Sequence, residues 1–215
     1  MAAPRPFAVV PAAGHSRRMG RHKLLLPLGD RSVVRRVIDA FLAAGVRDIF
    51  ILVRDDDRPL RQELADSGAR IVLAPNATPD MRHSVALLLE TISRDCAPHD
   101  GDAWLLAPAD HPTLNVAVVQ FLRAAWLGGR GPILVPTYGG RRGHPTLFSW
   151  EFAARVRGIP MDRGLDWLLE RYAASVEELP LDRPEVLFDL DTPADYERLQ
   201  ALGDSLPDAD CRRGQ

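Results

Sequence analysis

The chain has 215 residues and a mass of 23.8 kDa, a size typical of one globular domain with a sizeable core. Its composition of 46% hydrophobic and 26% charged residues excludes wholesale disorder. Because 27 basic residues face 29 acidic ones, for a net charge of −2, the charge balance offers no polyanion-binding surface and argues against nucleic acid as a partner.

Apolar strand patterns alternate with helical patterns along the first two thirds of the chain. Residues 7–12 form a short, continuously apolar run, which is typical of a buried parallel strand. Ser32 is a candidate cap for a helix whose apolar positions repeat with helical spacing until Gly45. Strands are then predicted at 48–53, 69–73, 103–108 and 132–136, and helices at 58–67, 81–93 and 115–127.

The last third is less regular. A turn at 139–143 precedes a strand at 145–148 that we expect to run antiparallel to the others. A helix at 164–173, short strands at 176–179 and 186–188, and a helix from Thr192-Pro193 to residue 202 follow. These patterns predict a single α/β domain over residues 1–202, with a mostly parallel, Rossmann-like sheet sandwiched by helices and a small antiparallel part in its second half. Residues 203–215 have little apolar content and are predicted to be a disordered tail.

The two cysteines and the hydropathy pattern indicate the cellular compartment in which the protein is expected. Cys96 and Cys211 are far apart and have no His or Cys at ligand spacing, so neither a disulfide framework nor a structural zinc site is expected. No segment approaches the roughly 20 apolar residues that span a bilayer. We therefore expect a cytoplasmic protein with no membrane partner.

The loop over residues 12–23 follows the first predicted strand, at the sheet edge where α/β proteins bind ligands. Small residues that let backbone N–H groups approach a phosphate alternate there with basic residues that offer it positive charge. They are Gly14, Ser16 and Gly20, and Arg17, Arg18 and Lys23. The spacing fits neither a Walker A loop nor a dinucleotide fingerprint, and a basic surface loop is the alternative.

Lys23 is the only lysine, beside 26 arginines. An Arg-rich coding bias explains the imbalance by itself. The position of the exception still favours a role for it, because a lone lysine falls by chance within this twelve-residue loop only about one time in eighteen.

Two later loops carry carboxylates at predicted strand ends. Asp110 follows the strand at 103–108, and Asp189 and Asp191 flank one apolar residue, so that both point to one face of an extended chain. Carboxylates placed in this way suit a metal ion that neutralises phosphate charge. A turn role for Asp110, and a helix-capping role for one of the later pair, are the alternatives.

Taken together, these residues resemble the MobA-like nucleotidyltransferases, and within them the molybdenum cofactor cytidylyltransferase branch. The signature is Ala12-Ala-Gly-x-Ser-x-Arg-Met-Gly-x-x-Lys23, and its continuation Leu-Leu-Leu-Pro27 fits the cytidylyl branch better than the guanylyl branch. Further matches, in the expected order over about residues 7–202, are Met81-x-x-Ser84-Val85, Asp110-His-Pro112, Gly143-His-Pro145 and Asp189-x-Asp191-Thr-Pro193.

The resemblance implies a set of functional residues. The nucleotide would be bound by Ala13, Gly14, Ser16, Arg18, Lys23 and Ser84. Mg²⁺ would be held by Asp110 and Asp191, and Lys23, Arg18 and Asp110 would carry the chemistry. Gly143 and His144 would contact the second substrate, although a lone histidine read without the family is more often a packing or turn residue.

The chain departs from the family pattern at two positions. Asp166 stands where the family often has arginine, and His111 stands where glutamine is usual. A change from Arg to Asp weakens the attraction for an anionic acceptor at that point, so the acceptor need not be the usual pterin.

The resemblance implies a Mg²⁺-dependent transfer of a nucleoside monophosphate to a phosphorylated small molecule, with release of pyrophosphate. CTP is the favoured donor, molybdopterin cofactor the favoured acceptor, and a molybdoenzyme a conceivable protein partner. One alternative is a transferase of the same fold that uses GTP or another phosphorylated acceptor. Another is a non-catalytic module that binds and delivers a nucleotide or cofactor.

Overall fold

The computed structural model describes residues 3–14, 19–74 and 78–202, and a mixed β-sheet forms their centre. Its strands are β1 (Pro6–Pro11), β4 (Asp48–Arg54), β5 (Arg70–Ala74), β6 (Ala103–Leu106), β7 (Ile133–Tyr138), β8 (Arg141–Arg142), β9 (Thr146–Ser149) and β10 (Val176–Pro180). Their order is β10-β7-β9-β6-β1-β4-β5, with β8 paired to the end of β7. The sheet is parallel from β6 through β5, and β9 runs antiparallel between β6 and β7.

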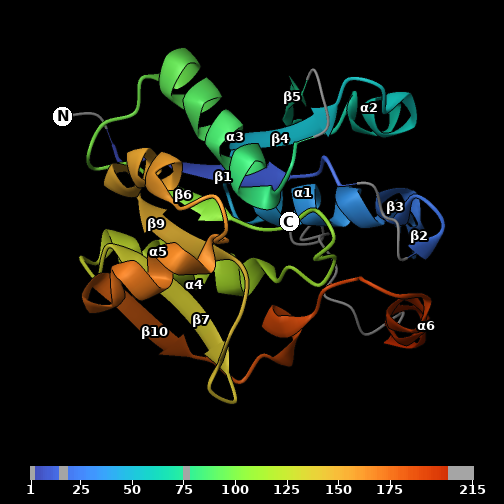
Figure 1. Cartoon of the computed structure of the whole chain (residues 1–215). Coiled ribbons are helices and arrows are strands. Elements are labelled where there is room, and N and C mark those ends of the chain that lie inside the picture. The colour runs from blue at the N-terminus through green and yellow to red at the C-terminus, as the bar shows by residue number, and fades with distance from the viewer. Residues whose placement is uncertain (1–2, 15–18, 75–77, 203–215) are drawn as a thin grey trace, which may run out of the picture.

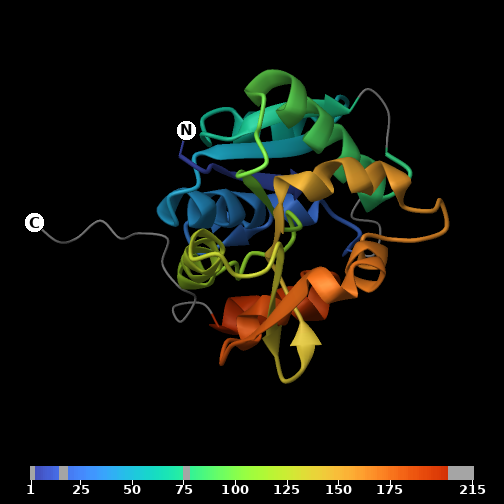
Figure 2. The ribbon, with the colours of Figure 1, turned by 90° about the vertical axis from the view of Figure 1, so that its left-hand side faces the viewer.

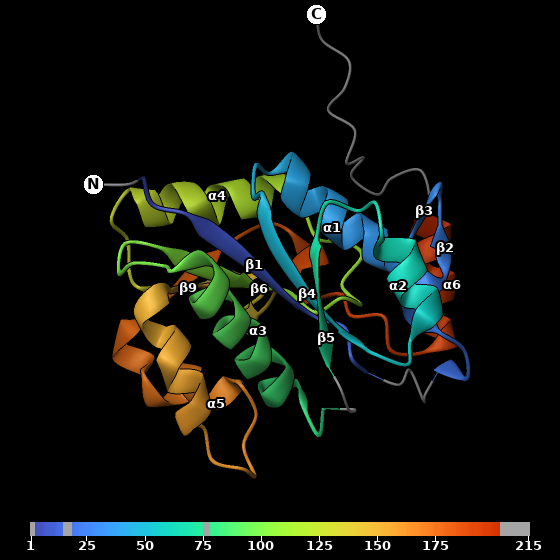
Figure 3. The ribbon, with the colours of Figure 1, turned by 90° about the horizontal axis from the view of Figure 1, so that it is seen from above.

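Helices cover both faces of this sheet. The elements are α1 (Val33–Ala43), α2 (Arg58–Leu64), α3 (Met81–Cys96), α4 (Val116–Leu127), α5 (Asp166–Arg171), α6 (Pro193–Leu202) and the 3₁₀ helix η3 (Trp150–Gly158). Helices α1 and α4 lie on one face, and α3, α5 and η3 on the other (Figures 1 and 3). The two apolar clusters of the core correspond to these two faces. Among the described residues, no helix is long and apolar enough to cross a membrane.

Side-chain caps fix where the helices begin. The Ser32 hydroxyl accepts a hydrogen bond from the Arg35 N–H (3.3 Å), and Asp80 caps α3 through the His83 N–H (2.8 Å). Each cap satisfies one of the N–H groups that the first helical turn leaves unpaired. Asp80 thereby sets the start of α3 at the rim of the sheet, where the loops after β1 and β6 also lie.

The structure confirms the predicted α/β class, the mostly parallel sheet and the antiparallel strand near 145–148. One predicted strand is wrong, because residues 186–188 belong to a 3₁₀ turn, η5 (Pro184–Leu187), and its C-cap. Proline at the start of this segment has no N–H for a sheet ladder and favours the first turn of a helix. The predicted tail at 203–215 lies outside the described residues.

Some elements were not predicted at all. They are η3, the single-turn 3₁₀ helices η2 (Lys23–Leu25) and η4 (Ala173–Ser175), and the hairpin of β2 (Pro27–Leu28) and β3 (Arg31–Ser32). In the side view of Figure 2, η3, in light orange, lies directly below α3, in green. The hairpin is tied to α6 by the Tyr196 hydroxyl, which donates to the Pro27 carbonyl (2.5 Å) and so holds the C-terminal helix near the loop after β1.

The central strand β6 offers a test of the packing. Trp104 is fully buried and stacks on Phe148 with ring centroids 4.2 Å apart, while its indole N–H has no hydrogen-bond partner among the described residues. We expect Trp104→Ala to lower the free energy of unfolding by about 3–5 kcal/mol. Trp104→Phe keeps the stacking and removes the unpaired donor, so its loss should be below about 2 kcal/mol. Urea unfolding measures both, and an equal loss in the two variants would contradict this packing.

Candidate active site

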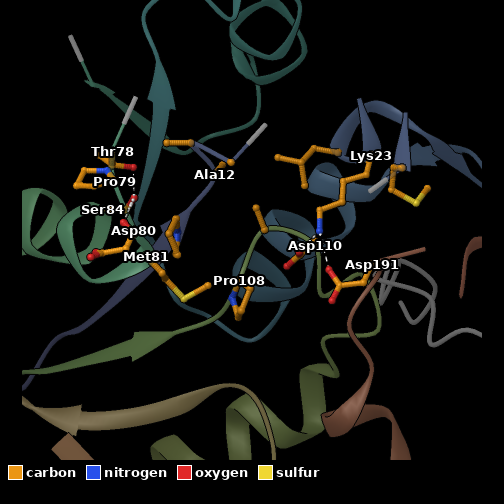
Figure 4. Close-up of a pocket in the computed structure, with 16 residues that line it drawn as sticks. Ala12, Lys23, Thr78, Pro79, Asp80, Met81, Ser84, Pro108, Asp110 and Asp191 are labelled. Carbon is orange, nitrogen blue, oxygen red and sulfur yellow. Dashed lines mark hydrogen bonds and ion pairs between the residues drawn. The ribbon is translucent and has the colours of Figure 1, made fainter. Parts of the chain in front are cut away.

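A cavity of about 720 Å³ opens where the loops after β1 and β6 meet the start of α3 (Figure 4). Lys23, Asp110 and Asp191 lie together on one side of it, and Thr78, Asp80 and Ser84 lie on the other. The remaining lining residues are Pro11, Ala12, Ala13, Gly14, Met19, Leu24, Pro79, Met81, Pro108 and Ala109. Sequence segments that are far apart therefore share one cavity at the carboxyl ends of the parallel strands.

The Lys23 ammonium is shared by two carboxylates. Nζ donates to Asp110 Oδ2 in a short hydrogen bond, to Asp191 Oδ1 (3.2 Å) and to the backbone carbonyl of Leu190 (2.9 Å). Burial alone would lower the pKa of Lys23, but the charges and hydrogen bonds of the two carboxylates outweigh it and raise the pKa above 10.5. The ammonium is therefore charged at neutral pH. Its pairing stabilises the fold below pH 10.5 and is lost as the pH rises through the raised value.

Backbone contacts bring the two carboxylates together. Asp110 follows β6, and its carbonyl accepts the Leu190 N–H (2.9 Å), which locks the loop before α6 against the loop after β6. The capping of α6 falls to Thr192 and Asp195, whose side chains and N–H groups bond one another. Asp191 is thus not used as the helix cap and instead faces the cavity.

Asp189 has a different environment from Asp191. Its carboxylate faces the His111 ring (Nδ1 to Oδ1, 3.4 Å) and it does not line the cavity. Burial by itself would raise the pKa of Asp189, but the hydrogen bond and charge of His111 lower it. His111 is fully buried, and this contact with Asp189 ties the loop after β6 to the segment before α6.

The two carboxylates of the cavity are groups that could hold a divalent metal ion. Both direct an oxygen at one point, now taken by the Lys23 ammonium, and oxygen ligands are the ones Mg²⁺ prefers. Within the described residues, no group of three or more His, Cys, Asp or Glu side chains could hold a metal ion.

The predicted nucleotide-binding residues fall into two groups. Ala13, Gly14, Lys23 and Ser84 all line the cavity, and the Ser84 hydroxyl bonds Thr78 Oγ1 (2.7 Å) and the Asp80 carbonyl (3.3 Å). Ser16 and Arg18 lie outside the described residues. The nucleotide role of all six stays a prediction.

Gly143 and His144, predicted to contact the second substrate, lie beside the cavity rather than in its lining. A Cβ at Gly143 would stand 2.4 Å from the Val186 carbonyl oxygen, and the His144 N–H donates to that oxygen (2.8 Å). The His144 ring meets His111 edge-on, and burial followed by the charge of His111 lowers its pKa to about 4. The imidazole is therefore neutral at pH 7, and its role as a substrate contact stays a prediction.

Asp166 lies in the first turn of α5, where it is exposed and outside the cavity lining. A carboxylate is favourable at that end of a helix because it faces the positive end of the helix dipole. The acidic residue at this position therefore has a local explanation that does not involve a substrate.

Several lining residues were missed by the sequence analysis. Thr78 and Asp80 precede a helix without a motif that marks them as ligand residues. The Leu190 carbonyl, which bonds Lys23 from outside the lining, carries no side-chain signal. Asp80 had one usable signal, since it immediately precedes an apolar helical pattern as caps do.

With this geometry established, the comparisons identify the relatives. A family model described as the MobA-like NTP transferase domain matches residues 8–176. The chain belongs to this family. The match covers β1 through the start of β10 and confirms the family resemblance, and with it a nucleotidyltransferase. A curated relative from Rhodopseudomonas palustris (strain HaA2), named molybdenum cofactor guanylyltransferase, is 29% identical over 212 residues and covers 95% of both chains.

Solved structures share the fold. Rv0371c from Mycobacterium tuberculosis H37Rv is 27% identical with a TM-score of 0.78, covering 93% of this chain and 98% of that one. Its complex with manganese is 25% identical with a TM-score of 0.73, covering 92% and 98%. A divalent metal is thus consistent with the fold, whereas Mg²⁺ in particular stays a prediction. The guanylyl name of the curated relative leaves the predicted cytidylyl subtype unconfirmed.

The position of Lys23 predicts competition with a metal ion. In Lys23→Met the carboxylates of Asp110 and Asp191 lose their shared cation. In the absence of nucleotide, we expect this variant to bind Mn²⁺ at least about tenfold more tightly than the unaltered chain does, because the repulsion between the ammonium and the ion is removed. Electron paramagnetic resonance titration of Mn²⁺ at pH 7 measures this. Arg61→Met is the control, because the Arg61 guanidinium bonds Asp55 and neither of the two carboxylates. Equal or weaker binding in Lys23→Met would contradict the shared position.

Proposed function

We propose that the chain transfers a nucleoside monophosphate from a nucleoside triphosphate to molybdopterin-type cofactor and releases pyrophosphate, with CTP as the preferred donor. The observation that supports this best is the Lys23 ammonium held between Asp110 and Asp191 at one side of the cavity. The loop over residues 12–23, called the glycine-rich loop from here on, also lines this cavity. Such a cavity combines a cation for phosphate oxygens with two carboxylates for a divalent ion.

The proposed reaction joins two anions. A phosphate oxygen of the acceptor forms a bond to the α-phosphorus of the triphosphate, and the bond from that phosphorus to the oxygen bridging it to the β-phosphate breaks, so that pyrophosphate leaves. No general base is needed if the acceptor is already ionised. Catalysis then rests on positioning and on stabilising the charge that develops on the leaving group.

Each residue has a part in this scheme. Ala13 and Gly14, with Ser16 and Arg18 from the same loop, bind the triphosphate, and Ser84 contacts the nucleotide from the opposite wall. Asp110 and Asp191 would hold Mg²⁺, which when bound screens the phosphates from one another. The Lys23 ammonium stabilises phosphate charge from its position between the carboxylates.

The base and the acceptor rest on different arguments. CTP is favoured by Leu-Leu-Leu-Pro at residues 24–27, directly after Lys23. GTP is the second candidate, because the Rhodopseudomonas palustris relative bears a guanylyltransferase name. Molybdenum cofactor as acceptor is favoured by the sequence signature and by that name, and Gly143 and His144 are the residues proposed to contact it.

The non-catalytic binding module is a weaker alternative. A module that only carries a nucleotide has little need for two carboxylates directed at one cation. Its observable mark would be thermal stabilisation by nucleotide without any pyrophosphate release.

The proposed activity predicts a nucleotide profile. With Mg²⁺ and molybdopterin cofactor present, we expect pyrophosphate release to be fastest with CTP, slower with GTP and weakest with ATP and UTP. A coupled pyrophosphate assay measures all four. GTP as the best donor would replace the proposed base and keep the transferase, and no release with any nucleotide would refute the proposed reaction.

The same assay tests the charged residues. Lys23→Ala and Asp110→Asn should each lower kcat/KM by on the order of 10²- to 10³-fold, the usual loss for one charged contact to the transition state. Circular dichroism would show that both remain folded. Lys23→Arg should also lose activity, because a planar guanidinium does not reproduce a compact ammonium between two carboxylates. Full activity in Lys23→Arg would show that the site does not require lysine at this position.

A further inference from the structure

A charged corner lies where β4 ends and α2 begins, outside the cavity lining. It consists of Arg54, the last residue of β4, and Asp57, the residue that caps α2. Asp57 is 4% exposed, and the guanidinium of Arg54 approaches its carboxylate (Nη2 to Oδ2, 3.5 Å). Burying a carboxylate this deeply costs free energy of folding unless it is paired. The partners of Asp57 and Arg54 therefore indicate the role of the corner.

The first contact of the corner is with the near end of the glycine-rich loop. Arg54 Nη1 donates to the carbonyl oxygen of Gly14 (3.0 Å), while Nε of the same guanidinium donates to Asp56 (2.9 Å). Gly14 itself lines the cavity. A glycine has no side chain to restrain its backbone, so a hydrogen bond from outside removes conformational freedom that the loop would otherwise have.

The second contact is with the far end of the same loop. His22 Nε2 lies 2.8 Å from Asp57 Oδ2, and the other carboxylate oxygen accepts the Leu60 N–H (3.3 Å). His22 directly precedes Lys23, whose ammonium lies between Asp110 and Asp191. The orientation of the chain at His22 therefore bears on where the Lys23 side chain starts.

We propose that Arg54 and Asp57 are positioning residues of the nucleotide site, which clamp the two ends of the glycine-rich loop to one corner and so raise the affinity for the triphosphate without touching it. The proposal rests on the proposed function, since it assigns the loop to a triphosphate. When Gly14 and His22 are already anchored before the ligand arrives, binding costs less ordering entropy at these two positions.

Two variants test the clamp from its two sides. Arg54→Met keeps an apolar stem but removes every donor to Gly14, and Asp57→Ser keeps a hydroxyl that caps α2 but is too short to reach His22. Each should raise KM for the nucleoside triphosphate roughly tenfold and leave kcat within about threefold. Calorimetric titration with Mn²⁺–CTP and Mn²⁺–GTP, without acceptor, should show the same loss of affinity.

Four controls separate positioning from a general loss of structure. Arg61→Met removes a cation from the same corner that bonds Asp55 instead of the loop, so it should bind nucleotide like the unaltered chain. Mn²⁺ alone should bind Arg54→Met and Arg61→Met like the unaltered chain, because neither arginine bonds Lys23, Asp110 or Asp191. The double variant His22→Phe/Asp57→Ser should bind nucleotide no more weakly than the weaker-binding of the two single variants, His22→Phe and Asp57→Ser. Both substitutions remove the same bond between His22 and Asp57. Arg54→Lys should recover part of the affinity.

The outcomes distinguish this inference from the proposed function. If the unaltered chain binds and turns over CTP or GTP, and Arg54→Met and Asp57→Ser do so with unchanged KM and affinity, the clamp is refuted and the transferase stands. Equal losses in Arg61→Met would also refute it, because the effect would then be structural. If the unaltered chain neither binds nor turns over any nucleotide, both proposals fall.

Discussion

The rest of the site depends on one interaction, the ammonium of Lys23 between the carboxylates of Asp110 and Asp191. Two like charges directed at one point repel one another, and a cation between them stabilises the arrangement. The three residues come from the loop after β1, the loop after β6 and the segment before α6. Because β1 and β6 are neighbours in parallel, their carboxyl ends place the first two together, and the Leu190 N–H bonded to the Asp110 carbonyl adds the third.

The chemistry of that cation explains why a chain with 26 arginines has lysine here. Lys23 donates from one nitrogen to two carboxylates and to the Leu190 carbonyl, three acceptors grouped around a point. An ammonium has three donors that radiate from one atom, whereas guanidinium donors lie in a plane and match carboxylates side by side. A point charge is also the closer substitute for a metal ion, so the same carboxylates suit either cation.

The sequence predicted those features that depend on local pattern and failed where distant contacts decide. Strand and helix alternation, the Ser32 cap and the carboxylates at strand ends all follow from neighbouring residues, and the structure bears out their placement. The apolar residues of the turn at Pro184–Leu187 predict a strand when the proline at its start is left out of account. No local pattern reveals that Arg54 reaches Gly14, since the two residues are neighbours only after β1 and β4 pair.

Charge is distributed differently at the corner and in the cavity. At the β4–α2 corner, Arg54 pairs with Asp56 and Asp57, and Arg61 pairs with Asp55. These pairs are close to neutral, so they restrain backbone without drawing phosphate away from the cavity. Among the described lining residues, Lys23 is the only cation, and it stands between two carboxylates. A triphosphate is therefore attracted at full strength only when a divalent ion offsets those carboxylates, which links nucleotide binding to metal binding through the electrostatics of a single lysine.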